Sequence, residues 1–436
     1  MTNVKMETIS KVKTIKQKLI EAFESTKQSF FGDVKLREAA IESIAKQGIP
    51  GRKSEEYKYV NMELLLKDDF VFLSSTKISK TQIEAIDFLK SAILIVIENG
   101  NFNRGLSRTE NLPKAIQVLN IADAPTNSAF QKHYSKQADV NLDAFTAMNT
   151  AFSKGGVFIH VAKDSVIETP IHVLSVSSSP ENCMINTRNL VVVEENAQVK
   201  IIESFETIES KTKLFTNTLT EIVVEAKAIV DHYKIQNESE NGNLLSTTQV
   251  LQKGKSVFST NTFTLKGSFI RNNLNIVLDG EHIETHLNGL YLTKGNQVVD
   301  NHTLVDHRKP NCNSNELYKG IIEDKSSATF NGKIFVQKDA QKTNAFQSNK
   351  NILLSDDGTI NTKPQLEIYA DDVKCSHGTS TGKLDEDKIF YLRARGLSET
   401  SAKKLLMHAF ASEVVDLIKI EELRAYVEEK ISQRFE

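Results

Sequence analysis

The segment Lys363-Pro-Gln-Leu-Glu-Ile-Tyr-Ala-Asp-Asp-Val-Lys-Cys-Ser-His-Gly378 lies at the boundary between two kinds of sequence. From Leu366 to Ala370, apolar residues alternate with polar ones, which predicts a half-buried β-strand. If that strand continues, Cys375 and His377 occupy positions i and i+2 and point to the same face. A thiol and an imidazole are therefore expected side by side at the end of a sheet.

The sequence before this segment is a long series of short runs rich in Val, Ile, Thr and Phe. No helix-length pattern interrupts the series between about residues 156 and 375. A doubly wound α/β sheet is excluded, because it needs a helix between successive parallel strands. The runs are Val157–Val161, Leu190–Val193, Val199–Ile202, Glu221–Val224, Ile229–Ile235, Ser256–Leu265 and Leu274–Leu278.

Turn signals separate these runs at fairly regular intervals, which suits one strand and one turn per unit. They include Asp279-Gly280, Gly295-Asn296, Arg308-Lys309-Pro310, Asp324-Lys325 and Asp356-Asp357-Gly358. A sandwich, a barrel, a propeller and a β-helix all remain compatible with the pattern. Short strands and frequent Asn-containing corners favour a stacked β-helix.

Both ends of the chain carry helical patterns. We expect an N-terminal helical region over residues 1–90, a β-rich core over 91–380 with the β-helix from about 156, and a C-terminal helical region over 381–436. Gly378 and Gly382 are expected to break the last strand, and Asp385 and Ser398 to cap the helices that follow.

The C-terminal region has a long apolar stripe at helical spacing, which includes Leu405, Leu406 and Phe410. Such a stripe packs either within a helical hairpin of the chain or against another protein. The spacing does not separate these two alternatives.

Net charge, the N-terminal residues and the cysteines indicate which kinds of partner and which cellular compartment fit this sequence. The chain has 436 residues and a net charge of -2, so bulk charge indicates neither a nucleic-acid partner nor an anionic membrane. Residues 1–23 lack the continuous apolar segment of a secretory signal. Three widely spaced cysteines, Cys183, Cys312 and Cys375, form no disulfide framework, which favours a cytoplasmic location.

Cys375 and His377 are the only cysteine and histidine close together in the sequence. Two donors cannot complete a metal site, because zinc and iron–sulfur centres take about four ligands, or three and an open position. A metal-binding role therefore requires further donors from elsewhere in the fold or from a partner chain, as in a half-site at an interface. The alternative is a buried structural cysteine beside a hydrogen-bonded histidine.

The remaining histidines give no metal motif. His282 and His286 lack the residue order of a zinc-protease helix, and we interpret them as surface or corner residues of the sheets. His302 and His307 receive the same interpretation. The sequence contains no phosphate-binding loop, no nucleophile elbow and no dinucleotide fingerprint, so no nucleotide-hydrolysing or acyl-transfer site is predicted.

The second half of the chain resembles the SufB/SufD family of iron–sulfur cluster assembly scaffolds, and within it the SufD-type subunit. The resemblance is densest after about residue 295 and extends more weakly over nearly the whole chain. It rests on Val299–His307, Ser314–Gly320, Phe330–Phe335, Ala340–Asn351, Asn361–Gly378 and Phe390–Gly396.

The resemblance implies a right-handed parallel β-helix core between helical ends and a non-catalytic scaffold within a SufBCD complex. It implies a SufB-type partner at the core and a SufC-type ATPase partner on the C-terminal helices. No intrinsic cofactor is expected, only a transient iron–sulfur cluster in the complex. His377 corresponds to an interfacial histidine of the family, and Cys375 is a secondary candidate. A homodimer of the isolated chain is also compatible with open β-helix edges.

Three alternatives stay open at this point. A SufB-type paralogue usually carries Glu after the histidine, where Gly378 stands here. A carbohydrate-active β-helix enzyme would need a catalytic cluster on one sheet and commonly a secretion signal. A purely structural β-helix protein would have no metal role.

Overall fold

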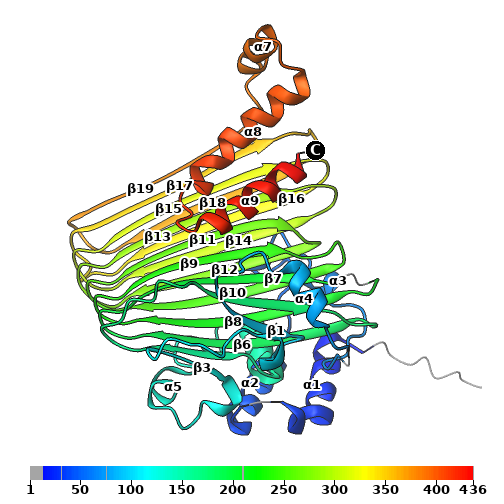
Figure 1. Cartoon of the computed structure of the whole chain (residues 1–436), viewed down its shortest axis with the longest axis vertical. Helices are drawn as coiled ribbons and strands as arrows, with labels where there is room; N and C mark the ends of the chain where they lie inside the picture. Colours follow the sequence, from blue (N-terminus) through cyan, green and yellow to red (C-terminus); the bar gives the residue numbers. More distant parts are fainter. Residues whose placement is uncertain (1–12, 31, 75, 209–210, 436) are drawn as a thin grey trace, which may run out of the picture.

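The computed structural model describes residues 13–30, 32–74, 76–208 and 211–435, and its centre is a stack of β-strands in two sheets (Figure 1). Residues 1–12, which hold part of the N-terminal segment considered above, lie outside the described residues. In the described chain one sheet follows the order β19-β17-β15-β13-β11-β9-β7-β5-β1-β2, and the other β18-β16-β14-β12-β10-β8-β6-β4-β3.

The strands of the first sheet, here called sheet B, are β1 (Ile93–Glu98), β2 (Asn101–Phe102), β5 (Ile171–Ser177), β7 (Gln198–Thr207), β9 (Ile229–Asn237), β11 (Val257–Lys266), β13 (Glu284–Thr293), β15 (Asn313–Ile322), β17 (Thr343–Leu353) and β19 (Val373–Gly382). Those of the second, sheet A, are β3 (Ile116–Asn120), β4 (Val157–Val161), β6 (Cys183–Val193), β8 (Leu214–Val224), β10 (Gly242–Gln252), β12 (Phe269–Leu278), β14 (Val298–His307), β16 (Ser327–Val336) and β18 (Thr359–Ile368).

From β4 onward, successive strands alternate between the two sheets, and from β6 onward each pairs in parallel with the strand two positions earlier. The chain therefore winds as a parallel β-solenoid of about eight turns, which confirms the predicted β-helix and excludes the sandwich, barrel and propeller. One corner repeats a left-handed backbone conformation from coil to coil. Its residues are Asp164, Asn196, Lys227, Lys255, His282, Asn311 and Lys342, with φ between 56° and 61°.

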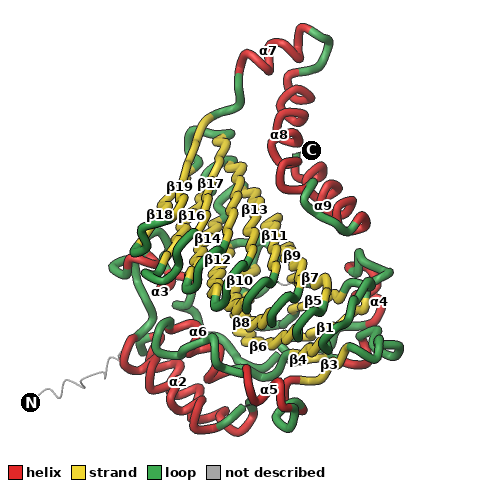
Figure 2. The backbone as a smooth tube through the Cα atoms, turned by 90° about the vertical axis from the view of Figure 1, so that its left-hand side faces the viewer, coloured by secondary structure: helices red, strands yellow, loops and turns green. Residues whose placement is uncertain are grey.

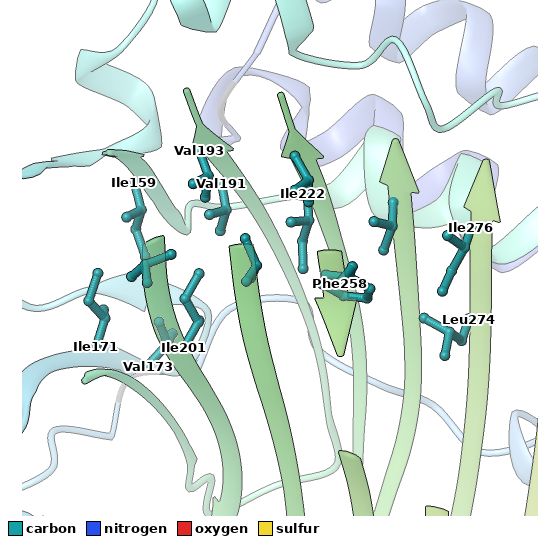
Figure 3. Packing of buried hydrophobic residues seen from close by; sticks show 14 of the residues in the cluster. Ile159, Ile171, Val173, Val191, Val193, Ile201, Ile222, Phe258, Leu274 and Ile276 are labelled. Atoms are coloured by element: carbon teal, nitrogen blue, oxygen red, sulfur yellow. The ribbon is translucent and has the colours of Figure 1, made fainter. Parts of the chain in front are cut away.

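The core between the two sheets is a column of apolar side chains in register. In Figure 3, Ile159, Val191 and Ile222 lie in a row on three neighbouring strands of sheet A, as their pairing requires. Ile201 and Phe258 extend from sheet B into the same cluster. Stacked apolar rows hold the coils together because burying one such side chain contributes about 1.5–3 kcal/mol.

The N-terminal helices cover the outer faces of the first coils. They are α1 (Ile15–Thr26), α2 (Val34–Gln47), α3 (Met62–Leu65) and α4 (Lys80–Ile86), with α5 (Ser128–His133) and α6 (Ala144–Phe152) further along the chain. Apolar residues of α1, α2, α3 and α6 pack on the outward side chains of Met184, Phe215, Leu245 and Phe269 on sheet A. Helices α2, α5 and α6 lie toward the end of the stack opposite β18 and β19, whereas α3 lies beside the middle of the stack (Figure 2).

The C-terminal helices are α7 (Glu386–Ala394), α8 (Glu399–Val415) and α9 (Glu421–Arg434). Asp385 and Ser398 cap α7 and α8 through side-chain oxygens, as predicted. Helix α9 and the second half of α8 pack on the outer face of sheet B, whereas α7 and the start of α8 extend beyond the last coil (Figures 1 and 2). Within the described residues, no helix has the length and apolar character needed to cross a bilayer.

Candidate metal site at the open end of the solenoid

Strands β18 and β19 form the last coil, and each ends its sheet. In the described residues, β18 pairs only with β16 and β19 only with β17. The outer edges of both strands therefore present backbone N–H and C=O groups that pair with no other described strand. Such an edge is a template for pairing with another polypeptide.

Residues 363–378 are divided between the two sheets. The strand predicted at Leu366 is present as β18, but it does not continue to His377, because β18 ends at Ile368 and residues 369–372 turn the chain into β19. Aspartates at 371 and 372 favour such a turn, and Lys342 of the previous coil donates its N–H to the carbonyl oxygen of Asp372.

Gly378 does not interrupt the last strand, contrary to the prediction, whereas β19 does end at Gly382, as predicted. Both lie within β19, and a Cβ atom at either position would meet nothing within 4 Å. A glycine is tolerated here because an edge strand is paired on one side only, so the lost side-chain packing costs little.

Cys375 and His377 do lie on one strand at positions i and i+2. Cys375 pairs in register with Ala345, and His377 with Gln347. Ala345 and Gln347 are buried between the sheets, so both side chains belong to the inward face of the last coil. Cys375 packs beside Leu366 and Ala345, whereas His377 is exposed at the open end.

The electrostatic settings of the two groups differ. Burial raises the pKa of the Cys375 thiol above its ordinary value, and a backbone hydrogen bond from Ala345 opposes that shift. The imidazole of His377 has no hydrogen bond or ion pair to any described residue. It is therefore free to bind an external group through either ring nitrogen.

The last coil offers fewer ligand side chains than a metal site needs. Throughout the part of the chain that the structure describes, no group of three or more His, Cys, Asp or Glu side chains is arranged to hold a metal ion. Cys375 and His377 could supply two of about four ligands to an iron–sulfur cluster. Further donors must come from outside the described residues.

The other cysteines and histidines have structural environments. Cys183 is buried and burial raises its thiol pKa to about 11, while the Cys312 thiol donates to the carbonyl oxygen of Gly280 at 3.2 Å.

The surface interpretation of His307 is wrong, because this residue is fully buried inside the solenoid. Its Nε2 lies 2.9 Å from Ser314 Oγ, and burial lowers its pKa to about 4. Its inward position follows from strand register.

His302 is also less exposed than predicted. Its Nε2 lies 2.8 Å from Asp300 Oδ1 and its Nδ1 3.1 Å from Glu56 Oε2. The pKa of His302 is raised, because the attraction of Asp300 and the hydrogen bonds outweigh burial. Arg271 donates to Asp300 and stacks on the ring of Tyr57 at 4.0 Å. This cluster attaches the N-terminal region to sheet A.

The predicted docking residues of α8 divide into two environments. Leu405 is exposed and Leu406 half-buried in the projecting part of the helix. Phe410 packs toward the solenoid, with Lys319 Nζ 4.0 Å from its ring centroid. Phe390 and Tyr391 of α7, which the sequence did not single out as docking residues, are 73% and 57% exposed.

Comparison with known proteins identifies the family. Residues 175–410 match the model of the SufBD core domain of the SUF iron–sulfur cluster assembly system, and residues 14–173 match that of the SufBD N-terminal region. The chain belongs to the SufBD family. It is a SufBD family protein of iron–sulfur cluster assembly, as the resemblance of the motifs implied.

Individual SufBD relatives match over nearly the full length. A SufBD family iron–sulfur cluster assembly protein of Synechocystis is 32% identical over 412 residues, covering 92% of this chain and 91% of the relative. SufD of Escherichia coli is 29% identical over 402 residues, covering 90% and 91%. A chloroplastic protein of Arabidopsis thaliana is 27% identical over 402 residues, covering 89% and 83%. The cytoplasmic location of this chain stays a prediction.

Proposed function

We propose that this SufBD protein is a SufD-type scaffold subunit that completes a cluster-assembly site together with a SufB-type subunit. The similarity to SufD of Escherichia coli over 90% of the chain supports this assignment. Gly378 after the histidine supports it as well, because SufB-type sequences usually carry Glu there. In this proposal the chain itself catalyses no reaction, and the iron–sulfur cluster is its cargo.

The observation that carries the proposal is an incomplete donor set at an open end. His377 is exposed on the last coil, and Cys375 lies beside it as a half-buried thiol. A SufB-type thiolate would add the softer donor that iron prefers, next to the borderline imidazole of His377. The unpaired edges of β18 and β19 supply the backbone groups through which a partner strand could align these donors.

Apolar side chains around the last coil fit the same interface. Phe346, Ile368 and Tyr369 are 44%, 38% and 60% exposed. They lie on β17, at the end of β18 and in the turn before β19. Burying such residues against a partner provides the apolar contact that a stable interface needs. The same edge would also support a homodimer of the isolated chain.

The test is the His377→Ala variant, co-expressed with SufB-type and SufC-type subunits and reconstituted anaerobically. We expect the complex to form normally, because a single side chain at the rim contributes little to the interface area. Cluster absorbance should fall severalfold. His282→Ala serves as the matched control, since His282 is an exposed corner residue of the same solenoid, and Cys375→Ala tests the secondary donor. Normal cluster yield with His377→Ala would exclude the proposed role.

The C-terminal helices are proposed to bind the SufC-type ATPase subunit. The support is the exposed apolar surface of Phe390, Tyr391 and Leu405 on the projecting α7–α8 segment. Leu405→Asp should abolish pull-down of the ATPase subunit, because a charge in an apolar contact is costly. Leu417→Asp, at an exposed leucine beyond the end of α8, should leave pull-down unchanged. Equal pull-down of both variants would contradict the docking proposal.

A further inference from the structure

Three polar side chains occupy the same position on successive strands of sheet B. Glu316 on β15 pairs in register with Gln347 on β17, and Gln347 pairs with His377 on β19. Glu316 and Gln347 are 5% and 3% exposed, so the column leads from the closed interior to the open end. Adjacent strands are only about 4.8 Å apart, so Gln347 and His377 are nearest neighbours in register on the inward face of the last two coils of sheet B.

The contact within the column leaves the carbonyl oxygen of Gln347 without a hydrogen-bond donor. Gln347 Nε2 donates to Glu316 Oε2 at 2.6 Å. Above its pKa of about 7, Glu316 is an ionised carboxylate that only accepts hydrogen bonds, so it orients the amide with its N–H toward Glu316 and its carbonyl away. Gln347 Oε1 is buried and has no hydrogen-bond partner among the described residues. A buried carbonyl oxygen without a partner costs free energy unless a donor reaches it.

The opposite sheet leaves space for this amide. A Cβ atom at Gly332 on β16 would lie 2.2 Å from Gln347 Nε2 and 2.8 Å from its Cδ. Any larger residue at 332 would displace the glutamine side chain. The geometry of the glycine and the unused acceptor are independent observations about the same amide.

We propose that Gln347, held by Glu316 and given room by Gly332, is a positioning residue for the His377 imidazole. The two groups are not hydrogen-bonded in this structure; when the exposed imidazole turns toward Gln347, Oε1 accepts the N–H of one ring nitrogen. That bond selects the tautomer whose other nitrogen offers its lone pair toward the open end. Metal-binding histidines are commonly oriented by such an acceptor on the second nitrogen. The assignment of a metal to His377 rests on the proposed function, but the tautomer does not.

The test uses the full chain without metal, labelled with ¹⁵N-histidine, at pH 8. The His377 signals are identified by their loss in His377→Gln. Ring nitrogen shifts then report the tautomer ratio. An ordinary hydrogen bond biases that ratio about fivefold. Gln347→Met preserves the shape of the side chain and removes the acceptor, so the bias should be lost.

Two further variants separate orientation from folding. Gly332→Ala leaves the glutamine in the sequence but displaces its amide, and it should reduce the bias in the same direction. Ser348→Ala, at the next residue of β17, should leave the His377 signals unchanged. An unchanged tautomer ratio in both Gln347→Met and Gly332→Ala, with the fold intact, would overturn the inference.

Cluster reconstitution distinguishes this inference from the proposed function. If His377→Ala abolishes cluster formation while Gln347→Met changes neither tautomer nor cluster yield, only the positioning role fails. If His377→Ala leaves the cluster yield normal, the proposed function fails, and the NMR result decides the orientation of the imidazole independently.

Discussion

The buried carboxyl group of Glu316 should make this solenoid less stable as pH rises, and Glu316→Gln should remove that dependence. Glu316 lies inside the solenoid, where burial raises its pKa to about 7 despite hydrogen bonds from Thr303 and Gln347 that lower it. The amide of glutamine has the same shape and can still accept from Gln347, but it does not titrate. The substitution therefore isolates the cost of burying the charge.

The magnitude follows from the two pKa values. An unfolded chain releases the Glu316 proton near 4.5 and the folded chain near 7. A group with a raised folded pKa contributes stability that is complete below the unfolded pKa and is lost as pH rises through the folded pKa. Relative to full protonation, the wild type should lose about 1 kcal/mol at pH 5 and about 3 kcal/mol at pH 8.

The assay is urea denaturation of both proteins at pH 5 and pH 8, followed by circular dichroism because the chain contains no tryptophan. The free energy of unfolding of Glu316→Gln minus that of wild type should increase by about 2–3 kcal/mol between the two pH values. Equal denaturant slopes are required for the comparison. Glu240→Gln, at an exposed position, serves as control and should show no such increase. A difference that stays constant or falls with pH would refute the reasoning.

Three other substitutions test separate parts of the structure. Glu221→Gln should lower the free energy of unfolding by about 3–5 kcal/mol in denaturation experiments, because it leaves the fully buried guanidinium of Arg188 without its carboxylate. Glu413→Ala should raise the hydrogen-exchange rate of α8 amides about tenfold, because Glu413 Oε2 accepts from the buried Lys319 Nζ of sheet B at 2.6 Å. Unchanged exchange would show that this ion pair does not hold α8 on the sheet. Lys255→Val should lower stability by about 1–2 kcal/mol relative to Lys255→Gly, because a β-branched residue is strained at φ 60°, and equal melting of the two variants would argue against corner strain.

Local patterns predicted much of the architecture. The short β-rich runs, the corners between them and the caps at Asp385 and Ser398 all depend on neighbouring residues, and the structure confirms them. A period of two or 3.6 residues is a property of the adjacent chain, so the sequence reports it directly.

The turn after Ile368 shows where local reasoning fails. The alternation before it and the Cys-Ser-His sequence after it both resemble strand, so the local pattern does not show that two strands are present. In the structure, the chain turns there because the preceding coil turns at the same level. Gln341 and Lys342 of that coil form hydrogen bonds with Asp372. The position of a corner is thus set partly by the coil beneath it.

By itself, the sequence determined the class of fold, the helical ends and the shared face of Cys375 and His377, because each depends on spacing within a few residues. Only the tertiary structure decided that His377 lies at an open end above Gln347 and Glu316, and that Gly332 faces this amide. Those relations join residues about one coil apart. They arise from the pairing register of the strands, because a slip of one residue would turn every side chain of a strand to the opposite face of the sheet. No local sequence pattern specifies that register.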